Sequence, residues 1–259
     1  MSVVWISQGE GDLPSSPDWL TESERQRAQT MRYTKRRNDY LLGRWTAKYA
    51  VARALGWRVD TAHLAAIEIR NVSDGLARGA PLAFVGGRAA PLSISMTDRA
   101  AWGVCAVLEG GMSLGCDLEL VEPRSAAFIR DYLTPGECAR VAGATSEDDA
   151  HRLANLIWSA KESALKVLRT GLRRDTRSVD VSVDDEPATT GWCRFVVTAE
   201  EGTQFPGWWR RYGNFLLTLA APQRLDPPRS LVEPPSLEGA VPSHRWMASP
   251  IAATRLEHH

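Results

Sequence analysis

The stretch Trp158–Lys166, W-S-A-K-E-S-A-L-K, lies within a run from about His151 to Leu168 that predicts an amphipathic helix. At 100° per residue one stripe, typical of a helix packed against a core, is formed by Leu153, Leu156, Ile157, Ala160, Ala164 and Leu168. Glu162 points roughly opposite this stripe, with Lys166 one turn further on and Lys161 beside them. A solvated Glu–Lys pair explains such a face on an arbitrary helix. A second carboxylate site across a cleft would instead make Glu162 a metal ligand and the lysines phosphate ligands.

A candidate for that second site is the predicted strand 113–121, S-L-G-C-D-L-E-L-V. Its period of two places Asp117 and Glu119 side by side on one face, together with Gly115. Two neighbouring acids fit an exposed sheet edge. They also fit a site for Mg²⁺, which binds one or two carboxylates together with substrate phosphates. We expect Gly115 to leave room for a bulky ligand.

Composition limits the classes of protein to consider. The chain has 259 residues, 44% of them hydrophobic, and its 31 basic and 31 acidic side chains cancel. It is long enough for a core, and nothing global indicates a nucleic-acid or membrane partner. Four scattered cysteines favour a reduced, cytoplasmic protein. The final L-E-H-H resembles a tag remnant, and the remaining histidines form no constellation typical of a triad hydrolase or zinc enzyme.

The first part of the chain predicts basic helices followed by strands. A strand is expected at 2–8, a helix opening at the capping box of Thr21 and Glu24, and a second helix from about Asn38 to Leu55. Between positions 22 and 58 stand ten Lys or Arg and three acids, which indicates either a solvated face or an anion site. Further strands are expected at 63–72, 82–85, 91–96 and 101–108.

The second part repeats the order of helices and then strands. Helices are expected at 126–132, 135–141 and 151–168, and strands at 179–183, 193–199 and 215–220. We therefore predict an α+β protein with two tandem similar halves, each an antiparallel sheet packed with helices, at 1–112 and 113–221, with the active site in the cleft between them. No sequence repeat is evident. The proline-rich tail, 222–259, is expected to be extended or disordered and without chemistry.

Two motifs then point to a family. The segments G-C-D-L-E (115–119) and W-S-A-K-E-S-A-L-K (158–166) resemble, in order and spacing, the two signatures of the 4′-phosphopantetheinyl transferases. The resemblance extends over roughly Val3 to Ala221, through L-L-G-R-W, a G-A-P turn and an S-I-S segment. The length indicates the surfactin-type subfamily, in which two similar halves lie in one chain.

The resemblance implies Mg²⁺-dependent (or Mn²⁺-dependent) transfer of phosphopantetheine from coenzyme A to a serine of an acyl or peptidyl carrier protein, with release of adenosine 3′,5′-bisphosphate. It implies that the metal is held by Asp117, Glu119 and Glu162, with Glu137 as an additional water-mediated ligand. Lys161 and Lys166 would lie near the phosphates, and Glu162 would be the general base. The catalytic residues would thus be Glu162 and Lys166.

The resemblance also implies that coenzyme A is bound by N-terminal basic residues, the G-A-P turn and the segment 95–97. The residues concerned are Arg27, Arg37, Arg44, Arg78, Ser95, Met96, Thr97 and Asp117. Two positions depart from the family pattern: Ala80 replaces a lysine and Met96 replaces a phosphate-binding histidine. Because methionine donates no hydrogen bond, the departures predict weaker affinity for coenzyme A or a shifted contact to its 3′-phosphate, with Arg78, Arg99 or the N-terminal arginines compensating.

Carrier docking in the subfamily implies apolar residues beside the cleft, for which Phe128, Tyr132 and Leu133 are candidates; each also fits a core position. The chain would act as a monomer in polyketide, nonribosomal peptide or fatty acid biosynthesis. Two alternatives remain open. One is a non-catalytic module that binds coenzyme A or a carrier protein on the same fold. The other is a metal-dependent nucleotide phosphohydrolase, which fits the carboxylates but not the spacing of the motifs.

Overall fold

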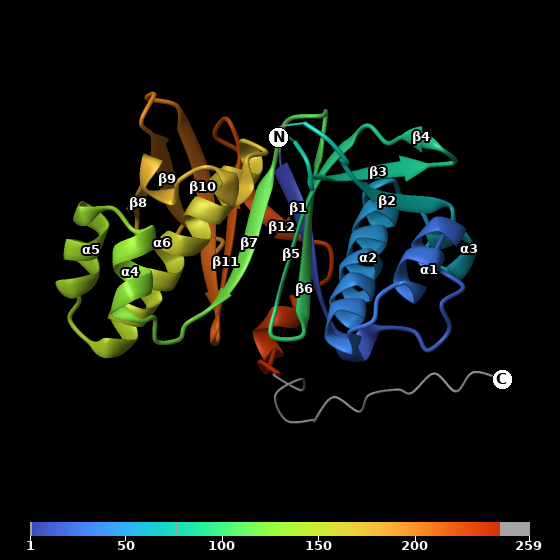
Figure 1. The fold of residues 1–259 in the computed structure, drawn as a ribbon, viewed down its shortest axis with the longest axis horizontal. Coiled ribbons are helices and arrows are strands. Elements are labelled where there is room, and N and C mark those ends of the chain that lie inside the picture. Colours follow the sequence, from blue (N-terminus) through green and yellow to red (C-terminus); the bar gives the residue numbers. More distant parts are fainter. Residues whose placement is uncertain (1, 76, 244–259) are drawn as a thin grey trace.

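The computed structural model describes residues 2–75 and 77–243 and has an α+β architecture of antiparallel sheets packed with helices, as predicted. Figure 1 shows the helices on two flanks with the two larger sheets between them, and the small three-stranded sheet beside the helices of the right-hand flank. One apolar core lies under the helices of each flank, and a third lies between the two central sheets. This third core holds Trp5, Trp192 and Tyr212, whose rings contact one another.

The second half of the chain forms a five-stranded sheet covered by three helices. The sheet order is β7-β11-β10-β9-β8. The strands are β7 (Gly115–Leu120), β8 (Val179–Val183), β9 (Cys193–Ala199), β10 (Gln204–Tyr212) and β11 (Phe215–Ala220). The helices are α4 (Ala126–Tyr132), α5 (Pro135–Ala142) and α6 (Glu147–Val167). The predicted apolar stripe of α6 packs into the core beneath it, with Leu156, Ile157, Ala160 and Ala164 fully buried.

The first half distributes its strands over two sheets, with orders β12-β1-β6-β5 and β2-β3-β4. The strands are β1 (Ser2–Gly9), β2 (Ile67–Asn71), β3 (Pro81–Val85), β4 (Arg88–Ala89), β5 (Leu92–Arg99), β6 (Trp102–Glu109) and β12 (Asp226–Ser230). The helices are α1 (Glu22–Gln29), α2 (Thr34–Ala54) and α3 (Thr61–Ala65).

The two halves repeat each other at a spacing of 113 residues. Adding 113 to the bounds of α1 and α2 gives the bounds of α5 and α6, and W-T-A-K (45–48) recurs as W-S-A-K (158–161). The strands repeat at nearly the same spacing. β2, β3 and β5 begin 112 residues before β8, β9 and β10, and β6 begins 113 residues before β11. The two halves therefore repeat the same order of elements, although only the W-[ST]-A-K segment marks the repeat in the sequence.

One difference between the halves matters for the site. The order β7-β11-β10-β9-β8 corresponds to β1-β6-β5-β3-β2, but in the first half the sheet divides between β5 and β3, whereas β10 and β9 remain paired. A cavity described below opens along this division.

Several expected elements differ in the structure. The strand expected at 63–72 begins only at Ile67, because Asp60 caps a short helix through the backbone N–H of His63. β10 was not predicted, since Pro206 and Gly207 interrupt its pattern. Gly207 is required there because a Cβ atom would overlap the Phe195 ring. The tail is not disordered throughout: β12 pairs in parallel with β1, and Leu237 is buried. Residues 244–259, with the tag-like end, lie outside the described residues.

Side chains join the halves where β5 runs beside β7. The hydroxyl oxygens of Ser95 and Thr97 accept hydrogen bonds from the backbone N–H groups of Cys116 (2.8 Å) and Leu118 (3.2 Å). Met96, between them, points to the other face of β5 and lies against Gly43 of α2. Across residues 2–75 and 77–243, no helix combines the length and apolarity needed to cross a membrane.

Candidate functional site

The predicted carboxylates of β7 face α6 and are buried. Cys116, Leu118 and Leu120 point into the core between the sheets, so Asp117 (7% exposed) and Glu119 (9% exposed) point to the opposite face. The alternative of an exposed sheet edge is therefore wrong. Gly115 serves this packing rather than a ligand, since a Cβ atom there would overlap the carbonyl oxygen of Ser163 in α6.

Asp117 accepts hydrogen bonds on both carboxylate oxygens. Oδ1 lies 2.8 Å from Nζ of Lys166 and 3.2 Å from the hydroxyl of Thr97, and Oδ2 accepts a hydrogen bond from Ser159 at 3.0 Å. Nζ of Lys166 also donates to the carbonyl oxygen of Cys116 at 2.8 Å. Although burial lowers the pKa of Lys166, the Asp117 carboxylate raises it further, so this lysine stays charged.

Glu119 is held by two arginines and an indole. Oε2 lies 2.9 Å from Nη2 of Arg124 and 3.2 Å from Nε of Arg99, while Oε1 accepts a hydrogen bond from Nε1 of Trp158 at 3.0 Å. Burial and the neighbouring Asp117 nevertheless raise the pKa of Glu119. The arginines neutralise the charge of Glu119, so Arg99 is engaged here rather than at a nucleotide phosphate.

Glu162 differs from the other two carboxylates, because no described residue forms a hydrogen bond or ion pair with it. Burial, and to a smaller extent repulsion from Asp117, raises the pKa of Glu162 to about 7, although the positive charge of Lys166 lowers that pKa in part. Glu119 adds to the repulsion. Glu162 therefore belongs to one electrostatic cluster with Asp117, Glu119 and Lys166.

Lys161 and Glu137 lie elsewhere, and the predictions for both are wrong. They are fully buried and form an ion pair of 2.7 Å. Nζ of Lys161 also donates to the carbonyl oxygens of Thr176 and Val179, each at 2.8 Å. Glu137 accepts hydrogen bonds from the backbone N–H groups of Thr134 and Val181. This pair fastens α5 and α6 to β8 and has no access to a phosphate or a metal.

Lys166 also borders a cavity between the halves, along the division of the first-half sheet. We call it the interhalf cavity. It is lined by the G-A-P turn, β5, the start of β7 and the loop after α6, with charged side chains from Arg78, Lys166, Arg169 and Arg173. Ser95 and Met96 line it as well, but the Ser95 hydroxyl is already engaged by β7. Thr97 lines none of the cavities described here, and its hydroxyl bonds Asp117 and Leu118.

A second, more open cavity lies over α1, α2 and β2. Its lining includes the predicted residues Arg27 and Arg44 and again Met96, which thus separates the two cavities. Arg44 is largely buried, donates to the side chain of Asn71 at 2.6 Å and lies over the Tyr40 ring. Arg37 is exposed and lines neither cavity.

The predicted docking residues form part of an aromatic cluster. The rings of Phe128, Tyr132 and Trp158 lie 4.9–5.1 Å apart, and the Arg124 guanidinium lies over Phe128. Tyr132 is 39% exposed and Phe128 partly buried, so both remain docking candidates. Leu133 is 1% exposed and belongs to the core, which excludes it as a docking residue.

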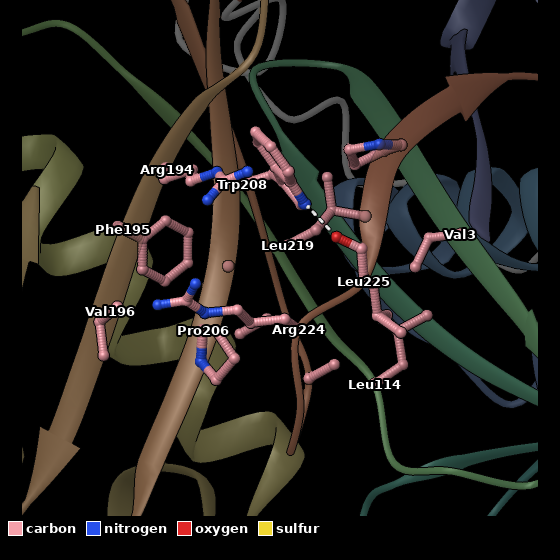
Figure 2. A pocket seen from close by; sticks show the side chains of 14 residues that line it. Val3, Leu114, Arg194, Phe195, Val196, Pro206, Trp208, Leu219, Arg224 and Leu225 are labelled. Carbon is pink, nitrogen blue, oxygen red and sulfur yellow. Dashed lines mark hydrogen bonds between the residues drawn. The ribbon is translucent and has the colours of Figure 1, made fainter. Parts of the chain in front are cut away.

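A third cavity, shown in Figure 2, is lined by β9, β10 and β11 together with Val3 and Leu225, and by no residue of α6. Arg194 lies over the Trp208 ring, and Nε1 of Trp208 donates to the carbonyl oxygen of Leu225 at 3.0 Å. Its lining contains none of the site residues predicted from the sequence, all of which the structure describes.

Sequence reasoning missed several polar residues of the site, namely Arg124, Asn155, Ser159, Arg169 and Arg173. Ser159 stands within the quoted motif, and its position one turn before Glu162 could have indicated it. Arg124 and Asn155 bond each other at 2.6 Å across 31 residues, and no local pattern indicates that contact.

The donor chemistry of the cluster suits a hard cation, since it contains three carboxylates that interact electrostatically. In the described part of the chain, however, no three His, Cys, Asp or Glu side chains are already arranged to hold a metal ion. Asp117 and Glu119 are neutralised by Lys166, Arg99 and Arg124 instead. Binding a cation would therefore require part of these ion pairs to open.

Comparison with known proteins places this cluster in a family context. No curated protein matches the chain. Residues 113–219, which run from two residues before β7 into β11 and contain all four members of the cluster, match the family model of the 4′-phosphopantetheinyl transferase superfamily.

Proposed function

We propose that the protein transfers the 4′-phosphopantetheine arm of coenzyme A to a serine of an apo acyl or peptidyl carrier protein, releasing adenosine 3′,5′-bisphosphate. The observation that carries this proposal is the electrostatic cluster of Asp117, Glu119, Glu162 and Lys166, of which Lys166 also lines the interhalf cavity, within the segment that matches the superfamily. The repetition of the two halves supports the surfactin-type subfamily.

The reaction forms a bond from the serine oxygen to the β-phosphorus and breaks the bond from that phosphorus to the leaving bisphosphate. We assign Lys166 to neutralise phosphate oxygens, because its charge is held at the border of cluster and cavity. We assign Glu162 to accept the serine proton, since its carboxylate has no hydrogen bond or ion pair in the described structure; a bound cation would lower the pKa that burial raises in the metal-free protein.

Asp117, Glu119 and Glu162 are the carboxylates that would hold Mg²⁺, and Mn²⁺ suits the same oxygen ligands. The ion would supply positive charge to the diphosphate and to the leaving phosphate. Thr97 and Ser159 orient Asp117, and Trp158 orients Glu119. Because Trp158 also packs on Phe128 and Tyr132, we propose this aromatic face, beside the cluster, as the place where a carrier protein docks.

A non-catalytic module for coenzyme A or carrier proteins is the second candidate. It is favoured by Met96 and Ala80, which depart from the family pattern beside the interhalf cavity, and by ion pairs that already occupy Asp117 and Glu119.

One assay separates the candidates. The protein is incubated with coenzyme A, Mg²⁺ and a panel of apo acyl and peptidyl carriers that a broad-specificity transferase can load, and each carrier is weighed by mass spectrometry. We expect at least one carrier to gain one phosphopantetheine arm, and the gain to disappear with EDTA. Tight binding of coenzyme A without modification of any carrier would instead establish the binding module. Hydrolysis of coenzyme A without carrier would indicate a phosphohydrolase.

A further inference from the structure

The interhalf cavity has an unusual balance of charge. Four basic side chains line it and none of its lining residues is acidic. The second cavity also has four basic side chains, Arg27, Arg36, Arg44 and Arg70, but they are matched by four acids, Glu24, Asp39, Glu68 and Asp98. Lys166 is paired with Asp117, but the lining of the first cavity still has more basic than acidic side chains, whereas that of the second is balanced, so the first is the better place for a ligand with several negative charges.

The loop after α6 brings two of these arginines to the cavity. Arg169 follows the helix end in the left-handed region (φ 57°), a conformation that L-residues adopt only at a cost. Arg173 donates through Nη2 to the carbonyl oxygen of Arg169 at 3.0 Å and through Nη1 to that of Arg78 at 3.4 Å. These contacts hold the loop of the second half against the turn of the first.

The guanidinium groups of Arg78 and Arg169 keep donors for a ligand. Among the described residues, no carboxylate pairs with the side chain of Arg78 or Arg169. Both are exposed, and both line the same cavity as Gly79, Ala80 and Met96. Since alanine and methionine offer no donor to an anion, these arginines supply the donors at this end of the cavity.

We propose that Arg78, Arg169 and Arg173 bind the 3′-phosphate of coenzyme A, in place of the N-terminal arginines Arg27, Arg37 and Arg44. This inference rests on the proposed function. Coenzyme A carries three phosphates, and the two of its diphosphate must lie at the reacting carboxylates and Lys166. The remaining phosphate, on the ribose, then meets the cationic groups further along the cavity. The loop after α6 is thereby a determinant of specificity for the 3′-phosphorylated nucleotide.

The test compares coenzyme A with 3′-dephospho-coenzyme A, which lacks only the phosphate in question. Dissociation constants are measured calorimetrically, without carrier protein, for the wild type and for Arg169→Asn, Arg173→Ala and Arg78→Ala. Asparagine is chosen at 169 because it tolerates the left-handed region. We expect each variant to bind coenzyme A about tenfold or more weakly and 3′-dephospho-coenzyme A within about twofold of wild type.

Two further variants complete the design. Arg58→Ala removes a charge from a side chain that is 89% exposed and lines neither cavity, and should change neither constant. Arg27→Ala tests the N-terminal alternative. The inference is overturned if Arg27→Ala alone removes the preference for the 3′-phosphate, or if the loop variants weaken both ligands equally. Should the wild type bind neither ligand, the proposed function itself fails.

Discussion

Glu137 and Glu162 each have a lysine nearby, Lys161 and Lys166 respectively, yet they differ in their hydrogen bonds and burial. Glu137 is fully buried with all its oxygens engaged by Lys161 and two backbone N–H groups. Glu162 is partly exposed, and no described residue pairs with it. The first arrangement suits a structural ion pair and the second a group that meets a ligand.

Substitution of Lys161 should therefore mainly lower stability, whereas substitution of Lys166 should mainly abolish activity. Lys161→Met leaves Glu137 buried without its counter-charge, and we expect the free energy of unfolding to fall by about 3–5 kcal/mol. Lys166→Met removes a partly exposed partner, and Asp117 keeps its hydrogen bonds from Thr97 and Ser159, so we expect a smaller loss of stability together with the abolition of transfer. Urea unfolding of both variants measures the difference. Equal losses of stability would contradict the assignment.

The raised pKa of Glu162 predicts how stability depends on pH. Its folded-state pKa of about 7 exceeds the ordinary 4.5, so folding favours the protonated form, and this contribution is lost as the pH rises through 7. In metal-free buffer, Glu162→Gln should therefore be more stable than wild type at pH 8, by about 1–2 kcal/mol after allowance for solvent screening. At pH 5 the two should be nearly equal. Thermal unfolding at both pH values provides the measurement.

The exposed residue Glu186 supplies the control for that experiment, since Glu186→Gln should change the melting temperature at neither pH. Mg²⁺ at pH 8 should raise the melting temperature of the wild type more than that of Glu162→Gln, because the variant lacks one proposed ligand. A Glu162→Gln variant less stable than wild type at pH 8 would show that the carboxylate is stabilised by contacts in the fold.

At the scale of elements, the helices of the second half could be predicted from local signals. The capping box of Thr134 and Glu137 and the apolar stripe of α6 are visible in the sequence, and both are present. The role of Lys161 could not be predicted, because its partners belong to α5 and β8 and depend on the packing of three elements. The repeated W-[ST]-A-K segment was a missed signal, since Lys48 forms the same pair with Glu24 in the first half.

The hairpin of β5 and β6 contains a feature that no periodicity indicates. Its two turn residues, Ala100 and Ala101, have φ values of 50° and 67°, which glycine or asparagine adopts more readily. We expect Ala101→Gly to increase the free energy of unfolding by about 0.5–1 kcal/mol, because it relieves this strain. Ala139→Gly on the exposed face of α5 is the control and should lower it by about 1 kcal/mol. If denaturant unfolding shows that both variants change the free energy of unfolding in the same direction, the turn geometry is contradicted.

At the scale of the whole molecule, the division into helices and antiparallel sheets followed from the sequence, but the course of the tail did not. After β11 the chain returns to the first half, where β12 pairs with β1 and Trp102 donates to the carbonyl oxygen of Val241 at 3.1 Å. Clustered prolines suggested a linker because they break local patterns. A parallel pair with the first strand of the chain is a contact between distant segments that local patterns do not report.

Leu237 tests whether this return is part of the fold. It is 1% exposed in the core between the sheets, so Leu237→Ala should lower the free energy of unfolding by about 2–4 kcal/mol. Val241, 75% exposed, supplies a matched control, and Val241→Ala should stay within about 0.5 kcal/mol of wild type. A Leu237→Ala variant as stable as wild type in urea would mean that the tail is dispensable for folding.

The central claim is that the cluster on β7 and α6 transfers phosphopantetheine from coenzyme A to a carrier. Its most direct test is the single-turnover rate of arm transfer to a responsive apo carrier, followed by intact mass, in wild type and in a Glu162→Gln variant shown to be folded. We predict transfer by the wild type and a loss of about 100-fold or more in the variant. Equal rates in the two proteins, or no transfer by the wild type to any carrier that a control transferase loads, would contradict it.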